Sequence, residues 1–325
     1  RVQWGQPIGK HDAIAQKLGT MAADTFAMES VVGLTSAMAD TKQFDIRLEA
    51  AFAKMWNSER AWLTANDALQ IRAGRGYETH ESLQQRGETP YPIERMLRDL
   101  RINLVFEGSS EIMRLFIARE AVDDHLKVAG DMIDPRAPVG RRLAALVRAG
   151  LHYAWWFPTR FLGWGHWPRF GEFGPLARHL RFIDRTARKL ARSTFYAMVR
   201  FGPKLEKRQA VLGRIVDVGA ELFVMTAACV RAQQMRTENP SDPTPVTLAD
   251  LFCRQARRRI RHSFDNLFAN DDTATYAVAG QAMEGRFSWL ETEAVVSMAE
   301  AYPEPDSATA TTGVDTREPE PAGAD

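Results

Sequence analysis

A helical spacing of apolar residues recurs over most of this chain and constrains its fold more than any other feature. Between residues 10 and 38 the apolar side chains step by three and four positions, and the same spacing returns between 45 and 71. Such a stripe lines one face of an α-helix, whereas an alternation by two would indicate a strand. No convincing alternation is found, and residues 1–9 resemble a loop or strand end. The sequence therefore predicts an all-α helical bundle.

The helices fall into two groups, separated by a segment rich in glycine and proline at 130–140. We expect a first helical domain at 1–130, carrying any cofactor and catalytic site, and an additional helical domain at 137–300. The sequence after 303 has almost no large apolar side chain, which predicts a disordered tail over 303–325. The further helices are predicted at 93–101, after Glu107, and at 140–157, 174–201, 203–238, 247–269 and 273–300.

Charge and cysteine content exclude several classes of protein. The net charge is +1, which gives no general affinity for nucleic acid, although the tail from 303 has six acids against one base. Two cysteines far apart in the sequence and seven histidines without ligand spacing predict neither a disulfide framework nor a metal site. The chain begins at Arg1 without a targeting segment, so we expect a fragment of a longer protein. We expect a bacterial cytoplasmic location, membrane-associated in one alternative, or a mitochondrial one in a eukaryote.

Glu107 lies between an aromatic residue and a glycine, just before a predicted helix. Gly108 frees the backbone beside the acid, and Ser109 or Ser110 can cap the helix that follows. A loop at a helix entrance is a useful place for a catalytic acid or base. It is also where an ordinary first-turn glutamate occurs, because the helix dipole favours one. The spacing alone favours the ordinary interpretation.

Two further segments have a functional and a structural interpretation. The glycines and alanine of residues 73–76 allow a backbone or a phosphate to approach closely, but a helix end followed by a turn explains them equally well. Near the N-terminus, Arg1 is suited to phosphate oxygens and Trp4 to a planar ligand. A surface arginine beside a loop aromatic is the simpler interpretation of that segment.

Taken together and in this order, four segments resemble the C-terminal half of an acyl-CoA dehydrogenase. They read R-x-Q-W-G-x-P-I-G-K-H, Q-I-x-A-G-x-G-Y, E-R-M-L-R-D-x-R-I and F-E-G-S-S-E-I-M-R-L, and the resemblance covers Arg1 to about Leu126. It implies an all-α domain, bound FAD, and a homodimer or dimer of dimers whose FAD site is shared between subunits. The family's N-terminal helical domain and central β-domain have no counterpart in this chain.

The resemblance also implies roles for individual residues. Glu107 matches the catalytic base, and Gly108 matches the glycine that lets a thioester approach. The family usually has two glycines where this chain has Ala73-Gly74, and we expect the extra methyl to be tolerated. The matched cofactor-binding positions are Arg1, Gln3, Trp4, Gln70, Ile71 and Gly74 towards the FAD of the adjoining subunit, and Ser109 and Glu111 beside the flavin of their own subunit.

The chemistry expected of Glu107 is removal of a proton from the carbon next to a thioester. An apolar pocket, with Phe106 and Ile112 as walls, would raise the pKa of such a carboxylate towards working pH. The flavin N5 would take the β-hydride, which gives a trans-2-enoyl-CoA. The resemblance implies electron-transfer flavoprotein as the electron acceptor. We expect the fragment alone to be inactive.

Two alternatives remain open at this point. One is an acyl-CoA oxidase, which passes its electrons directly to oxygen. The other is a flavin-binding protein on the same scaffold that acts on DNA or as an assembly partner. The arginine cluster at 254–261 is the only support for the DNA-binding alternative, and a solvated face paired with nearby acids is its simpler interpretation.

The second helical block resembles the very-long-chain branch of the family, whose members are dimers and associate with membranes. Its aromatic stretch at 152–173, with interleaved arginines, suits either a membrane interface or packing against the first block. Glycines and prolines within the stretch argue against one continuous amphipathic helix. We therefore favour packing, with peripheral membrane contact as the alternative.

Overall fold

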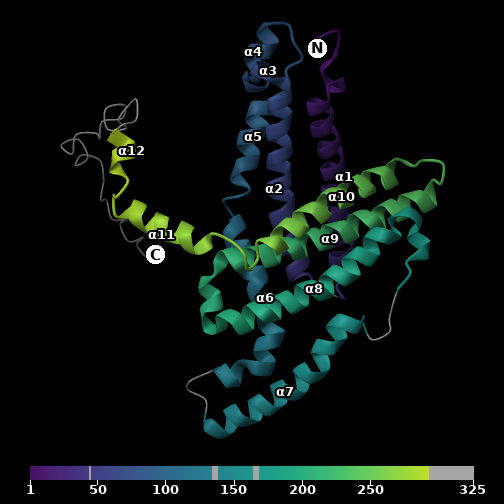
Figure 1. Ribbon diagram of the computed structural model, residues 1–325. Helices are drawn as coiled ribbons and strands as arrows, with labels where there is room; N and C mark the ends of the chain where they lie inside the picture. The colour runs from purple at the N-terminus through teal and green to yellow at the C-terminus, as the bar shows by residue number, and fades with distance from the viewer. Residues whose placement is uncertain (44, 134–137, 164–167, 293–325) are drawn as a thin grey trace, which may run out of the picture. The chain divides into compact units, whose positions relative to one another are not determined.

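The computed structural model describes residues 1–43, 45–133, 138–163 and 168–292, and the chain divides into two compact units, Arg1–Ala269 and Asn270–Asp325. The described residues are mainly helical, which confirms the all-α prediction (Figure 1). The predicted disordered tail lies outside the described residues. The helices are α1 (Asp12–Thr41), α2 (Arg47–Arg72), α3 (Gly74–Tyr77), α4 (His80–Gln85), α5 (Ile93–Ile102), α6 (Ser110–Ile133), α7 (Val139–Leu162), α8 (Ala177–Phe201), α9 (Gln209–Glu238), α10 (Thr244–Asp265), α11 (Asp272–Met283) and α12 (Ser288–Thr292).

Several helices begin or end where the local sequence requires it. Lys42 takes a left-handed conformation, with φ of 53°, and ends α1. The helix predicted at 203–238 is divided, because Pro203 belongs to a separate 3₁₀ turn, Gly202–Lys207, before α9 starts. The helix predicted at 273–300 is also shorter than expected: it ends at Met283, and α12 follows after a turn around Gly285.

The first residues form a small hairpin that the helical spacing alone did not predict. Strand β1 (Val2–Gln3) pairs antiparallel with β2 (Gln6–Pro7), with Val2 opposite Pro7 and Gln3 opposite Gln6. The two turn residues have positive φ, 49° at Trp4 and 78° at Gly5. This is the backbone of a tight two-residue hairpin turn, in which glycine is favoured.

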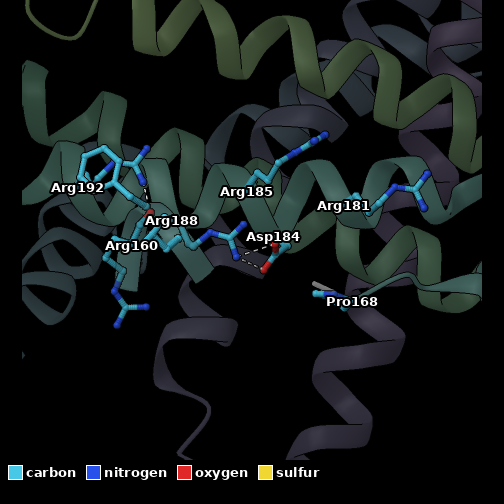
Figure 2. A pocket seen from close by; sticks show the side chains of 9 residues that line it. Arg160, Pro168, Arg181, Asp184, Arg185, Arg188 and Arg192 are labelled. Atoms are coloured by element: carbon cyan, nitrogen blue, oxygen red, sulfur yellow. Dashed lines mark hydrogen bonds and ion pairs between the residues drawn. The ribbon is translucent and has the colours of Figure 1, made fainter. Parts of the chain in front are cut away.

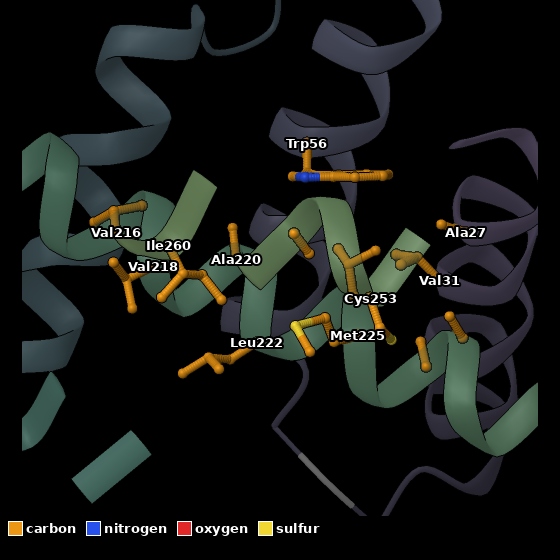
Figure 3. Close-up of a cluster of buried hydrophobic side chains, with 14 of the residues drawn as sticks. Ala27, Val31, Trp56, Val216, Val218, Ala220, Leu222, Met225, Cys253 and Ile260 are labelled. Carbon is orange, nitrogen blue, oxygen red and sulfur yellow. The ribbon is translucent and has the colours of Figure 1, made fainter. Parts of the chain in front are cut away.

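One core is shared by helices of the two sequence blocks. Buried side chains of α1, α2 and α6 pack with those of α8, α9 and α10, and Figure 3 shows Trp56 above residues of α9 and α10. The Trp56 and Phe252 rings meet edge to face with centroids 5.5 Å apart. Both cysteines lie in this core as free thiols, Cys229 on α9 and Cys253 on α10, with their Sγ atoms 3.7 Å apart. The division at 1–130 and 137–300 stays a prediction, and the helices on either side of it pack together.

A buried carboxylate links three helices within this core. Glu221 of α9 is 5% exposed. It accepts hydrogen bonds from Arg259 Nε at 2.6 Å and Nη2 at 2.9 Å, and from Trp56 Nε1 at 3.3 Å. A charge removed from water needs such partners to be tolerated. These contacts tie α2, α9 and α10 together.

Candidate active site

Glu107 lies in the loop between α5 and α6, in a conformation that non-glycine residues rarely adopt. Its φ is +52°, and that of Gly108 is +92°. The Ser110 N–H donates to the Leu104 carbonyl at 3.1 Å, which closes the loop at the start of α6. Strained backbone of this kind persists only where the surroundings hold it, and it is frequent at functional sites. Glu107 is exposed, and its backbone N–H and carboxylate make no hydrogen bond within the described ranges.

Gly108 has a structural reason to be glycine besides the close approach of a substrate. A Cβ built on Gly108 would lie 2.6 Å from the Met113 sulfur, and the positive φ is itself unfavourable for other residues. Phe106 and Ile112, the predicted apolar walls, are 44% and 58% exposed. Within this chain they do not enclose Glu107, so the expected apolar pocket stays a prediction.

Lys54 of α2 holds the Glu107 loop, and the sequence reasoning did not identify it. Its Nζ donates to the carbonyl oxygens of Asn103 at 3.0 Å and Phe106 at 3.4 Å, and also to that of Gly108. The sequence does carry one indication of this role, since Lys54 lies between Phe52 and Met55, two members of the apolar stripe of α2. A cation at that place must either reach solvent or find acceptors.

Ser109 and Glu111 line a cavity beside this loop. The cavity has a volume of about 360 Å³. Ser109 Oγ accepts the Ile112 N–H at 3.4 Å and caps α6. Hydrogen bonds from the Glu111 backbone N–H and from the Ser109 hydroxyl hold the pKa of the Glu111 carboxyl below its ordinary value. The other lining residues include Trp62, Arg101 and Leu104.

Gln3 and Trp4 lie in the N-terminal hairpin, which His11 braces. One ring nitrogen of His11, Nε2, lies 3.0 Å from the Gln3 carbonyl oxygen, and the other, Nδ1, lies 3.0 Å from Gln6 Nε2. A carbonyl only accepts, so Nε2 carries the proton and Nδ1 accepts from the glutamine. The Trp4 ring stands edge-on to His11 at 5.5 Å and is 89% exposed. Arg1 is also exposed, so both can reach a partner outside this chain.

Gln70, Ile71 and Gly74 lie where α2 gives way to α3. Ala73 between them has φ of 53° and ψ of −135°, a conformation that favours glycine. The expected tolerance of the Ala73 methyl group therefore applies only to its steric fit. Its energetic cost is the strain of this backbone conformation. A Cβ added at Gly74 would meet nothing within 4 Å, so the backbone there is open to approach.

The structure separates the predicted cofactor-binding residues into two places. The N-terminal hairpin and α3 lie towards the same end of α1 and α2, whereas the connection from α5 to α6 lies further along these helices (Figure 1). Neither group alone forms an enclosed site. Their assignment to FAD of two different subunits stays a prediction.

A second cavity, of about 440 Å³, is lined by arginines of α7 and α8. Figure 2 shows that the Arg160, Arg181 and Arg185 side chains point in different directions. Arg188 is paired with Asp184 at 2.8 Å. Because the guanidinium groups do not converge, this cavity is not a preformed anion site.

The two undecided stretches of the second block are largely accounted for by packing. Tyr153 and Trp156 of α7 contact His125 of α6 with ring centroids 5.8 and 5.2 Å apart, which confirms packing against the first block for these two residues. Phe157 instead contacts Phe195 of α8, within the second block, at 5.6 Å. Trp164 and Trp167 lie outside the described residues.

In the arginine cluster, Arg254 pairs with Asp250 at 2.8 Å and Arg259 with Glu221 at 2.6 Å. The guanidinium of Arg257 lies 4.5 Å from the Phe182 ring centroid. For Arg254 and Arg259 the prediction of pairing with nearby acids is confirmed. Among the described residues no group of His, Cys, Asp and Glu could hold a metal ion, and no helix is both long and apolar enough to cross a membrane.

Comparisons with known proteins agree with this arrangement. Residues 1–122 match the family model described as acyl-CoA dehydrogenase, C-terminal domain, and residues 176–284 match ACAD9/ACADV, C-terminal domain. The chain belongs to the acyl-CoA dehydrogenase family. All the site residues predicted from the sequence lie within the segment that matches the acyl-CoA dehydrogenase, C-terminal domain model.

Similar acyl-CoA dehydrogenases come from bacteria and mammals. A probable acyl-CoA dehydrogenase, FadE10, of Mycobacterium tuberculosis is 53% identical over 293 residues, which are 90% of this chain and 45% of that protein. The human mitochondrial very long-chain specific acyl-CoA dehydrogenase is 29% identical over 265 residues, 80% of this chain and 38% of that protein.

Among solved structures, an acyl-CoA dehydrogenase complexed with FAD from Bacillus anthracis aligns with a TM-score of 0.58 and 25% identity, over 81% of this chain and 43% of that one. The chain thus spans less than half the length of these relatives.

Proposed function

We propose that this chain is the C-terminal part of an FAD-dependent acyl-CoA dehydrogenase that converts a long-chain acyl-CoA to its trans-2-enoyl-CoA, with Glu107 as the base. The observation that carries the proposal is the loop at Glu107. Its carboxylate and N–H are both free of partners within the described residues, and both stand in a strained loop that α2 holds. A base needs this freedom to meet a substrate, and the positive φ sets this residue apart from an ordinary solvated glutamate.

The residues present fit a flavin dinucleotide shared between subunits. Trp4 is almost fully exposed, Gly74 is open, and the cavity at Ser109 and Glu111 lies beside the Glu107 loop. We propose that Arg1, Gln3, Trp4, Gln70, Ile71 and Gly74 hold the FAD of the adjoining subunit and that Ser109 and Glu111 contact their own. FAD supplies the acceptor for the β-hydride when it is bound. The solved relative complexed with FAD supports the choice of cofactor.

The groups of the chain itself would act at the α-carbon. The Glu107 carboxylate accepts the α-proton, and the Glu107 N–H donates to the thioester oxygen as negative charge develops there. We also propose that Gly108, which has no side chain, is the glycine that lets the thioester approach. The electrons would leave through electron-transfer flavoprotein, and the enzyme would work as a homodimer or dimer of dimers.

Replacement of Glu107 by Gln in the full-length protein tests this function. The variant should retain the flavin, since the amide keeps the shape of the side chain, but acyl-CoA should no longer bleach the flavin absorbance. Ser82→Ala, which removes a hydroxyl that donates to Glu78 at 2.9 Å, is a suitable control and should bleach normally. Normal bleaching by the Glu107→Gln variant would exclude Glu107 as the base.

The oxidase alternative differs only in the electron acceptor. Hydrogen peroxide formed with oxygen in the absence of electron-transfer flavoprotein would favour it. The DNA-binding alternative loses support because Arg254 and Arg259 are engaged with carboxylates. DNA affinity that falls steeply with salt would restore it.

A specific feature of α7 supports peripheral membrane contact as a second role. The helix exposes a row of apolar side chains four residues apart, namely Val139, Leu143, Val147, Leu151 and Trp155. Two exposed arginines, Arg141 and Arg142, lie between the first two members of the row, and apolar side chains beside basic ones suit the boundary between headgroups and acyl chains. Co-sedimentation of the full-length protein with anionic vesicles should fall for Leu143→Ser with Leu151→Ser. It should be unchanged for Tyr276→Ser, another exposed apolar position. Equal vesicle binding by the parent protein and both variants would exclude membrane contact through α7.

A further inference from the structure

We propose that Lys54 is a positioning residue for the base, because its ammonium group fixes the peptide groups on both sides of Glu107. The inference rests on the proposed function of Glu107 and adds the residue that sets the direction of its side chain. Lys54 itself touches neither the carboxylate of Glu107 nor the predicted substrate position.

The ammonium group is surrounded by main-chain acceptors. It donates to the Asn103 carbonyl at 3.0 Å and the Phe106 carbonyl at 3.4 Å, and it also bonds to that of Gly108. An ammonium group has three N–H donors, so its capacity matches these three acceptors. Asn103 is the C-cap residue of α5, and the free carbonyls and the negative end of the helix dipole there favour a cation.

Two of these carbonyls bracket the base. The Phe106 oxygen belongs to the peptide group that also contains the Glu107 N–H, and the Gly108 oxygen follows one residue after Glu107. When both peptide planes are fixed, the φ of +52° at Glu107 and +92° at Gly108 are fixed as well. These dihedrals determine where the Cα–Cβ bond of Glu107 points. The N–H that shares a peptide group with the Phe106 carbonyl is also polarised, which makes it a stronger donor.

The loop has few other restraints from outside. Within the described residues, no other side chain from a distant element donates to the carbonyls of residues 103–109. The Ser110 N–H to Leu104 bond closes the loop but leaves the Phe106–Glu107 peptide free to rotate. Loss of the ammonium group should therefore relax the loop towards conformations with negative φ, which L-residues prefer. The carboxylate would then stand away from the α-carbon for most of the time.

The experiment uses the full-length FAD-containing protein with three replacements: Lys54→Met, Lys54→Arg and, as a matched control, Lys189→Met. Met keeps the length of the chain without donors, and Arg restores charge and donors in a different geometry. Lys189 is a helical lysine of α8 whose ammonium lies 4.0 Å from the Phe264 ring centroid. The readouts are kcat and KM with acyl-CoA, and amide hydrogen exchange of a peptide spanning residues 103–113.

In Lys54→Met we expect kcat to fall about 10- to 100-fold with KM within about threefold, as for a misplaced reacting group. Exchange in the 103–113 peptide should speed up at least about tenfold, while Lys54→Arg recovers part of both and Lys189→Met changes neither. An unchanged kcat in Lys54→Met overturns the inference. So does a loss of kcat without faster exchange in this peptide, because the effect would then not pass through the loop.

Failure of the function and failure of the inference give different results. If Glu107→Gln still turns over, the function fails and the positioning role falls with it. If Glu107→Gln is inactive while Lys54→Met keeps its kcat, only the role of Lys54 fails. Should Lys54→Met not fold, Lys54→Gln, with two donors, provides the same readouts, and unchanged exchange and kcat in that variant overturn the inference.

Discussion

Arg114 of α6 donates its Nε–H to Asp217 Oδ1 of α9 at 2.9 Å, so the helix that follows the Glu107 loop is tied to the second helical block. The same guanidinium binds both oxygens of Glu59 on α2, at 2.6 and 3.0 Å. Burial raises the pKa of the Asp217 carboxyl, an effect that Arg114 opposes. Three helices from both blocks thus meet at one side chain.

Replacement of Arg114 by Met should lower the free energy of unfolding by about 2 kcal/mol, since two carboxylates lose their partner. The loss is below that of a fully buried pair because the Asp217 side chain is 38% exposed. Urea unfolding followed by circular dichroism measures it. The control is Arg95→Met, which breaks an exposed pair with Asp99 on α5 and should cost less than about 0.5 kcal/mol. Equal losses in the two variants would contradict the assigned role.

Ala73→Gly should stabilise the chain by about 1 kcal/mol, because glycine adopts φ of 53° with ψ of −135° without strain. The same replacement at Ala37, an exposed position inside α1, should destabilise by about 1 kcal/mol. Thermal unfolding of both variants gives the comparison. A lower midpoint for Ala73→Gly would show that its dihedral angles are not strained.

Gly108→Ala should cost about 2 kcal/mol, from the contact with the Met113 sulfur and from the positive φ. Gly33→Ala offers a matched control, since its new Cβ meets nothing within 4 Å in an exposed helical position, and it should stabilise by up to about 1 kcal/mol. Combining Gly108→Ala with Met113→Ala should relieve only the steric part of the loss. If Gly108→Ala were as stable as the parent protein, the assignment of a positive φ to Gly108 would be wrong.

The stability of the chain should fall as the pH drops below about 6.5, the ordinary pKa of histidine. His179 is buried on α8, with Nε2 2.8 Å from Asp250 Oδ1, and burial lowers its pKa despite that contact. The unfolded chain therefore takes up a proton first, and stability is lost until the folded histidine is protonated as well. Urea unfolding at pH 7.5 and 5.5 should show a smaller difference in His179→Gln, and an equal difference would assign the effect to another group.

The helices and the location of Glu107 follow from the sequence because both depend on local signals. The stripe of α2 sets its buried face, and Gly108 with Ser109 marks the loop and the start of α6. Lys54 could not be predicted in the same way, since it bonds to residues 49 and 54 positions later in the chain. The backbone strain at Ala73 could not be predicted either, because the residue type alone does not give the dihedral angles of a position.

The core shared by α1, α2, α6, α9 and α10 has a consequence for how such proteins can change during evolution. The segments that match the two family models pack together in this core; the first match ends at residue 122 and the second starts at residue 176. A truncation between them would leave Trp56 without Phe252 and Arg114 without Asp217. A relative without the second segment would therefore need polar side chains at the positions of the first segment that pack against it here.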